Sequence, residues 1–207
     1  MSEWIERARA ACRAASAYRD AARDAVARDV APEGKPDPAL IEREQRQVHG
    51  FGWIGTLVAA LEATADWAAR SSTGGRFGEV EALVLKIGCG EYLHQLISAL
   101  PMSQNEMLRP GDLGISEATE TLAADSEVRH FLEQGNNAAN RAALARALGE
   151  GTVPDEAFGD ETLDMIRAQF RAFTADRIAP HAHRWHLEDK LIPIETVREM
   201  ADLGVFG

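Results

Sequence analysis

The first thirty residues repeat apolar side chains at the spacing of an α-helix, and this pattern constrains the fold more than any other feature of the chain. The repeating apolar residues are Trp4, Ile5, Ala8, Ala11, Cys12, Ala15, Tyr18, Ala22 and Val26. The charged residues Arg9, Arg13, Asp20 and Asp24 fall on the opposite side. The pattern predicts one amphipathic helix from residue 2 to about residue 30. Because its seam is mostly alanine, a partner helix can approach it closely.

Composition favours helices throughout the chain. Of the 207 residues, 45% are apolar and 27% are charged, which is typical of a globular protein. Aromatic residues make up only 6%, alanine is abundant and β-branched residues are sparse. Helical patterns recur near residues 39–70, 78–100, 117–124, 126–134 and 137–148. The expected fold class is therefore all-α, with residues 1–150 forming an up-and-down helical bundle.

Loops and helix ends divide this predicted bundle. Proline and glycine interrupt the helical pattern at residues 31–38, and residues 71–75 and 101–115 are expected to be a turn and a loop. Ser116 and Asp125 are plausible N-caps, while Gly135 and Gly149 are plausible helix ends.

Glycines inside the predicted helices have two interpretations. Gly50, Gly52 and Gly55 weaken one helix and are expected to mark close helix packing. Gly88 and Gly90 flank Cys89 and superficially match a phosphate-binding motif, but such motifs follow a strand. We therefore favour close helix contact there as well.

The last 48 residues are expected to form a separate segment. Residues 151–159 are interpreted as a linker, and Asp160 as the cap of a helix whose buried stripe is Leu163, Ile166, Phe170 and Phe173. A connector broken by proline and a second helix should follow. That helix precedes an apolar Val-Phe pair, so we expect the chain to continue beyond residue 207.

Four features of this segment occur together in order. They are Ile178-Ala179-Pro180, Trp185, Ile192-Pro193 and the sequence Leu-Gly-Val-Phe-Gly at residues 203–207. In this order they resemble the opening of the first α-domain of acyl-CoA dehydrogenases. The resemblance implies that the complete enzyme would bind FAD and an acyl-CoA substrate, remove the α-proton with a glutamate base and pass a hydride to the flavin.

The same resemblance implies which partners the complete enzyme would have and which of its domains would carry the chemistry. The partners would be the remainder of the polypeptide, an electron-transfer flavoprotein and other copies of the enzyme. Because the family's base and most of its flavin site lie in later domains, no catalytic, cofactor-binding or metal-binding residue is expected within this chain, which alone should be inactive and bind no FAD. The alternative is a non-catalytic helical interaction or assembly module.

A second resemblance covers residues 91–114. This segment is similar to the helical extension before the dehydrogenase core in methylsuccinyl-CoA dehydrogenases, a branch of the family. It contains Ser103, Gln104, Asn105 and Arg109. These residues form either an ordinary polar loop or a contact with the enzyme core, in which Arg109 could bind a carboxylate.

Three histidines offer the clearest metal-like pattern. His181, His183 and His186 could ligate a transition metal, but a complete ligand set is not evident, so we interpret them as residues of a solvent-facing loop. Cys89 is a poor nucleophile candidate because His94, five residues on, is rotated away from it around the helix. Asn136 and Asn137 are better interpreted as a helix start.

Charge and hydropathy exclude other classes. The formal net charge of −11 disfavours nucleic acid as a partner. No apolar run approaches the roughly 20 residues of a membrane helix, and no signal-peptide pattern opens the chain. Cys12 and Cys89 have no metal-like spacing and are expected to be reduced thiols in the cytoplasm.

Overall fold

The computed structural model describes residues 2–206, and the chain divides into two compact units, Met1–Asp155 and Glu156–Gly207. The elements of the first unit are α1 (Ser2–Val30), α2 (Pro38–Arg43), α3 (Gln45–Thr73), α4 (Glu79–Ile97), β1 (Leu100–Ser103), β2 (Glu106–Leu108), a 3₁₀ turn (Pro110–Leu113), α5 (Ser116–Ala124), α6 (Ser126–Gln134) and α7 (Ala138–Gly149). Those of the second are α8 (Glu161–Phe173), a π-helical turn (Thr174–Ile178), α9 (Ala179–Leu187) and α10 (Ile194–Asp202). Since the strands form only one short hairpin, the all-α prediction is confirmed.

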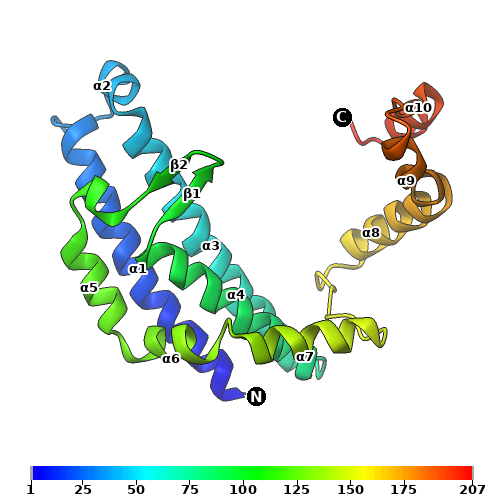
Figure 1. Cartoon of the computed structure of the whole chain (residues 1–207), viewed down its shortest axis with the longest axis horizontal. Coiled ribbons are helices and arrows are strands. Elements are labelled where there is room, and N and C mark those ends of the chain that lie inside the picture. Colours follow the sequence, from blue (N-terminus) through cyan, green and yellow to red (C-terminus); the bar gives the residue numbers. More distant parts are fainter. Residues whose placement is uncertain (1, 207) are drawn as a thin grey trace. The chain divides into compact units, whose positions relative to one another are not determined.

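The core of the first unit is built around α1. Figure 1 shows α1, α3 and α4 running alongside one another, and α5 and α6 also pack on α1. Ala8, Ala15 and Ala22 are fully buried on the seam of α1. The small side chains allow close helix approach, while larger residues such as Leu61 and Phe131 fill the remaining core. The amphipathic pattern of residues 2–30 therefore predicted both the helix and its buried face.

Only some of the helix glycines lie at close contacts. A Cβ atom added at Gly90 would be 2.5 Å from the backbone nitrogen of Asn136, and one at Gly50 would be 2.3 Å from Leu108 Cδ2. By contrast, nothing lies within 4 Å of such an atom at Gly52, Gly55 or Gly88. The helix-packing interpretation is thus correct for Gly90, whereas Gly50 lies against Leu108 of strand β2 and the other three glycines have no close neighbour.

The predicted loop at residues 101–115 contains a β-hairpin. Strands β1 and β2 pair antiparallel, with Leu100 opposite Leu108 and Ser103 opposite Glu106. Leu100, Met102 and Leu108 are buried, while the intervening residues are exposed or half-buried. This alternation extends over so few residues that it gives no clear strand signal in the sequence.

Asx side chains start several helices as expected. Asp125 Oδ1 accepts hydrogen bonds from the amides of Glu127 and Val128, at 2.9 and 3.0 Å, and Asn137 Oδ1 accepts one from the amide of Asn140. Ser116 is instead the first residue of α5, and the preceding cap position is Ile115. The predicted helix at 39–70 is two helices, because Glu44 has a non-helical backbone between α2 and α3.

The predicted proline-broken connector is helical up to Leu187 and non-helical from residue 188 to residue 193, so that expectation was only partly correct. Pro180 lies in the first turn of α9, which follows the π-helical turn directly, so this proline falls where the helix changes from π to α geometry. After α10, Gly204 has a φ of 81° and its amide donates to Ala201 O, while the Val205 amide donates to Met200 O. These two bonds form a Schellman C-cap.

The predicted buried stripe of the first helix in this unit is not buried. Asp160 caps α8 as expected, through hydrogen bonds from the amides of Thr162 and Leu163. However, Leu163 is 48% exposed and Ile166 43% exposed. Among the described residues of this unit, no second layer of helices covers that face. The periodicity of the sequence shows that the face is apolar but not whether another helix covers it.

Candidate functional site

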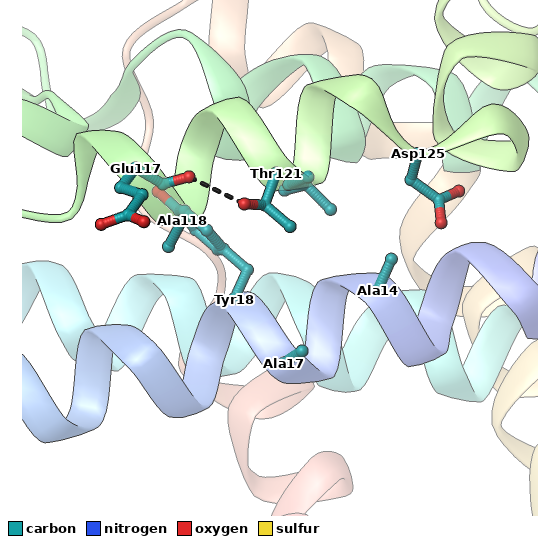
Figure 2. Close-up of a pocket in the computed structure, with 8 residues that line it drawn as sticks. Ala14, Ala17, Tyr18, Glu117, Ala118, Thr121 and Asp125 are labelled. Atoms are coloured by element: carbon teal, nitrogen blue, oxygen red, sulfur yellow. Dashed lines mark hydrogen bonds between the residues drawn. The ribbon is translucent and has the colours of Figure 1, made fainter.

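The best-formed groove of the first unit lies between α1 and α5. Figure 2 shows Ala14 and Ala17 on α1 and Ala118 and Thr121 on α5, with the Tyr18 side chain between the two helices near Ala118. The cavity volume is about 490 Å³. Three of its eight lining residues are alanine, and these small side chains leave space between the two helices that no larger residue fills.

The rim of this groove is acidic. Glu117 of α5 and Asp125, which follows α5, line it, and no basic residue is among the lining side chains. Thr121 Oγ1 donates a hydrogen bond of 3.0 Å to the Glu117 carbonyl, drawn in Figure 2, so this hydroxyl is already engaged. Asp125 is engaged as the cap of α6. The groove can accept apolar or cationic groups, and its carboxylates disfavour anionic ones.

The groove has no activated nucleophile. The hydroxyl of Tyr18 donates to Leu96 O at 3.0 Å, and burial raises the pKa of this phenol. Cys12 lines a separate cavity of about 620 Å³ between α1 and α3, and burial raises the pKa of its thiol to about 11. Burial also holds the pKa of Cys89 well above its ordinary value. Neither thiol is therefore suited to nucleophilic catalysis at neutral pH.

The three candidate histidines lie on a helix and not in a loop. His181, His183 and His186 belong to α9, where successive residues are rotated by about 100°, so His183 and His186 share a face of the helix and His181 lies on another. The His181 ring lies 5.5 Å from the Trp185 ring, centroid to centroid. Among residues 2–206, no group of three His, Cys, Asp or Glu side chains is placed to hold a metal ion.

The polar residues singled out near residue 105 lie at the tip and base of the hairpin. Ser103, Gln104 and Asn105 are exposed around the turn. Arg109 is also exposed, and its backbone amide, not its guanidinium, bonds to Asp112 Oδ2 at 2.8 Å. That hydrogen bond and the neighbouring Arg46 lower the pKa of the Asp112 carboxyl. The structure brings none of these residues to the groove.

One buried polar cluster was not expected from the sequence. Glu81 is 6% exposed, and the Asp155 side chain is 8% exposed. Asp155 falls in the predicted linker, where burial was not anticipated. The signal that could have found Glu81 is its position three residues after Gly78, at capping-box spacing.

No described helix is long and apolar enough to cross a membrane. This agrees with the absence of a long apolar run in the sequence.

Comparison with known proteins connects both units to one family. Residues 160–207 match the model of the acyl-CoA dehydrogenase N-terminal domain. The chain is 44% identical over 191 residues to a (2S)-methylsuccinyl-CoA dehydrogenase from Cereibacter sphaeroides, an alignment that covers 91% of this chain and 34% of that protein. The chain thus spans about a third of the length of this relative. The similarity extends well beyond the family-model match, and the two matches together support a relationship of the chain to the amino-terminal part of acyl-CoA dehydrogenases.

Proposed function

We propose that the complete protein is an FAD-dependent dehydrogenase that introduces an α,β double bond into an acyl-CoA thioester, with methylsuccinyl-CoA as the substrate. The observation that carries this proposal is the 44% identity to a (2S)-methylsuccinyl-CoA dehydrogenase across 91% of the chain. The similarity includes the helical bundle as well as residues 160–207, and the bundle is the part that distinguishes this relative from the family model.

We further propose a division of labour along the polypeptide. Residues 1–150 are a helical extension, 151–159 a linker and 160–207 the start of the family's first α-domain. Residues outside this chain supply the base and most of the flavin site. The complete enzyme is proposed to be a cytoplasmic homo-oligomer that passes electrons to an electron-transfer flavoprotein.

The described residues do not fit FAD. FAD carries a diphosphate, which proteins commonly hold at glycine-rich loops and helix N-termini or with basic side chains. The α1–α5 groove instead presents Glu117 and Asp125, and Gly88 and Gly90 lie inside α4 instead of ahead of a helix. We therefore assign no step of the reaction to residues of this chain.

Two polypeptides test the proposal. One is the 207-residue chain, and the other is the full product of the reading frame that contains it. Each is purified with FAD and assayed with an artificial electron acceptor and a panel of acyl-CoAs that includes methylsuccinyl-CoA. The expected result is a yellow, active long polypeptide and a colourless, inactive short one.

Three outcomes would contradict the proposal. Stoichiometric flavin on the 207-residue chain would refute the division of labour. A colourless, inactive long polypeptide, or a reading frame that stops after residue 207, would favour a non-catalytic interaction module.

A further inference from the structure

Asp155 is bound to the bundle through its backbone and its side chain. Trp67 Nε1 donates to the Asp155 carbonyl at 2.8 Å, and Ser71 Oγ donates to Asp155 Oδ2 at 2.7 Å. Arg76 Nε lies 3.0 Å from Asp155 Oδ1, and the Asp155 amide donates to Glu81 Oε1 at 2.8 Å. We call this set of contacts the Asp155 lock.

The partners of Asp155 are themselves held in place. Trp67 and Ser71 lie on α3, and Ser71 is only 1% exposed. The second oxygen of Glu81 accepts a 2.8 Å hydrogen bond from the Gly78 amide at the start of α4. The lock therefore joins the end of α3, the turn after it and the first residues of α4.

Energetics indicate that this arrangement is specific. Burying a carboxylate is costly unless hydrogen bonds or an ion pair compensate for its lost hydration. The buried carboxylates of Glu81 and Asp155 both have such partners. A segment that lay loosely on the surface would leave its carboxylate in water. The two buried, partnered carboxylates therefore indicate that Asp155 occupies a specific position.

Apolar packing contributes little to holding the same segment. Val153 is 70% exposed, and Pro154 is only half-buried. The backbone amide of Thr152 bonds to Ala147 O, which ties the segment to α7 before this point. Between Thr152 and the end of the first unit, Asp155 is therefore the principal attachment to α3 and α4.

The residues that follow Asp155 have different partners. Considered within the second unit alone, Glu156 forms an ion pair with Arg171, and the Phe158 amide donates to Asp164 Oδ1 at 3.1 Å. The Arg167 guanidinium lies over the Phe158 ring, 5.2 Å from its centroid. Glu156 and Phe158 thus have contacts within the second unit.

From these contacts we propose that Asp155 is a positioning residue. Its hydrogen bonds and ion pair hold the segment that follows α7 against the turn between α3 and α4. The lock fixes the point on the bundle from which the dehydrogenase-like segment starts. The segment at 151–159 is then not a free nine-residue tether, because its centre is docked. This role does not depend on which acyl-CoA the complete protein uses.

The exchange rates of two protons in the 207-residue chain test the lock, because each proton is donated in one of its hydrogen bonds. They are the Asp155 amide proton and the Trp67 indole proton, both measured by NMR. In the native chain both should be protected. Asp155→Ala should raise both exchange rates by about tenfold or more, because it removes hydrogen bonds to a charged group.

Glu150→Ala is the matched control. It removes the same charge five residues earlier, at an exposed position whose side chain has no hydrogen bond or ion pair among the described residues. It should change either rate by no more than about twofold.

Ser71→Ala is a second, milder variant, which tests the same contacts if Asp155→Ala unfolds the bundle. It removes one hydrogen bond to the carboxylate and should give a smaller increase in the same two rates, with unchanged helical circular dichroism. The proposal is wrong if the Trp67 indole exchanges freely in the native chain. It is also wrong if the Asp155 and Glu150 variants behave alike in a folded bundle.

Discussion

The two units have similar helical patterns in sequence but differ in burial. On α1, the seam residues Ala8 and Ala15 are fully buried by the surrounding helices. On α8, Leu163 and Ile166 occupy an equally regular stripe yet are 48% and 43% exposed. Among the described residues of the second unit, only Thr196 is buried. Periodicity thus predicts which face of a helix is apolar, while burial depends on whether a partner layer is present.

The largest expected difference between the units comes from removing a leucine side chain. Leu93 of α4 is fully buried, whereas Leu191, which precedes α10, is 91% exposed. Leu93→Ala should lower the free energy of unfolding of the bundle by about 3–5 kcal/mol, through lost burial and a new cavity. Leu191→Ala should change it by no more than about 0.5 kcal/mol. Urea denaturation monitored by circular dichroism measures both.

Equal effects of the two leucine substitutions would contradict the difference in burial between the two units. That result would mean either that the bundle core is loosely packed or that Leu191 is covered in the folded chain.

A smaller effect is expected where helices touch through glycine. A Cβ atom at Gly90 would lie 2.5 Å from the Asn136 backbone nitrogen, which cannot move without displacing the helix start after α6. Gly90→Ala should therefore destabilise the bundle by about 1–3 kcal/mol. Gly88→Ala, two residues earlier in the same helix with open space around it, is the control.

The control should be neutral or stabilise the bundle by up to about 1 kcal/mol, since alanine is the better helix former. Thermal unfolding of the two variants distinguishes them. A tolerated Gly90→Ala would remove the evidence for tight packing between α4 and the start of α7.

The smallest expected effect concerns helix caps, because each unit has a helix that starts with an aspartate cap. Asp125 and Asp160 each accept hydrogen bonds from two backbone amides at a helix start. Asp125→Ala should lower the stability of the bundle by about 1 kcal/mol. Asp160→Ala should fray α8 and leave the main unfolding transition unchanged, because α8 adds nothing to the bundle core. A shift of that transition in the Asp160 variant would show that the units unfold together.

Local signals predicted much of the fold. The long amphipathic pattern gave α1, and Asp125, Asn137 and Asp160 marked helix starts through side-chain caps. The order of features from Ile178 to residue 207 identified the family that the comparison also found. These are signals within a few residues of one another, and they need no knowledge of distant contacts.

Other features depended on tertiary contacts and could not be predicted. The hairpin at residues 100–108 has too few residues for its alternation to stand out, and its side chains are buried only because the bundle provides a surface. Gly88 and Gly90 look alike in sequence, and only the position of Asn136 separates them. The burial of Asp155 likewise requires Trp67 and Arg76, which are distant in sequence.

The bundle has its own buried core, whereas among the described residues from Glu156 onward only Thr196 is buried. Hydrogen exchange across the whole 207-residue chain, in a strictly monomeric sample, tests this difference most directly. We expect amides of α1, α3 and α4 to exchange only through global unfolding, and those of α8, α9 and α10 to exchange much faster through local opening. Protection of α10 equal to that of residues 80–97 would contradict the account.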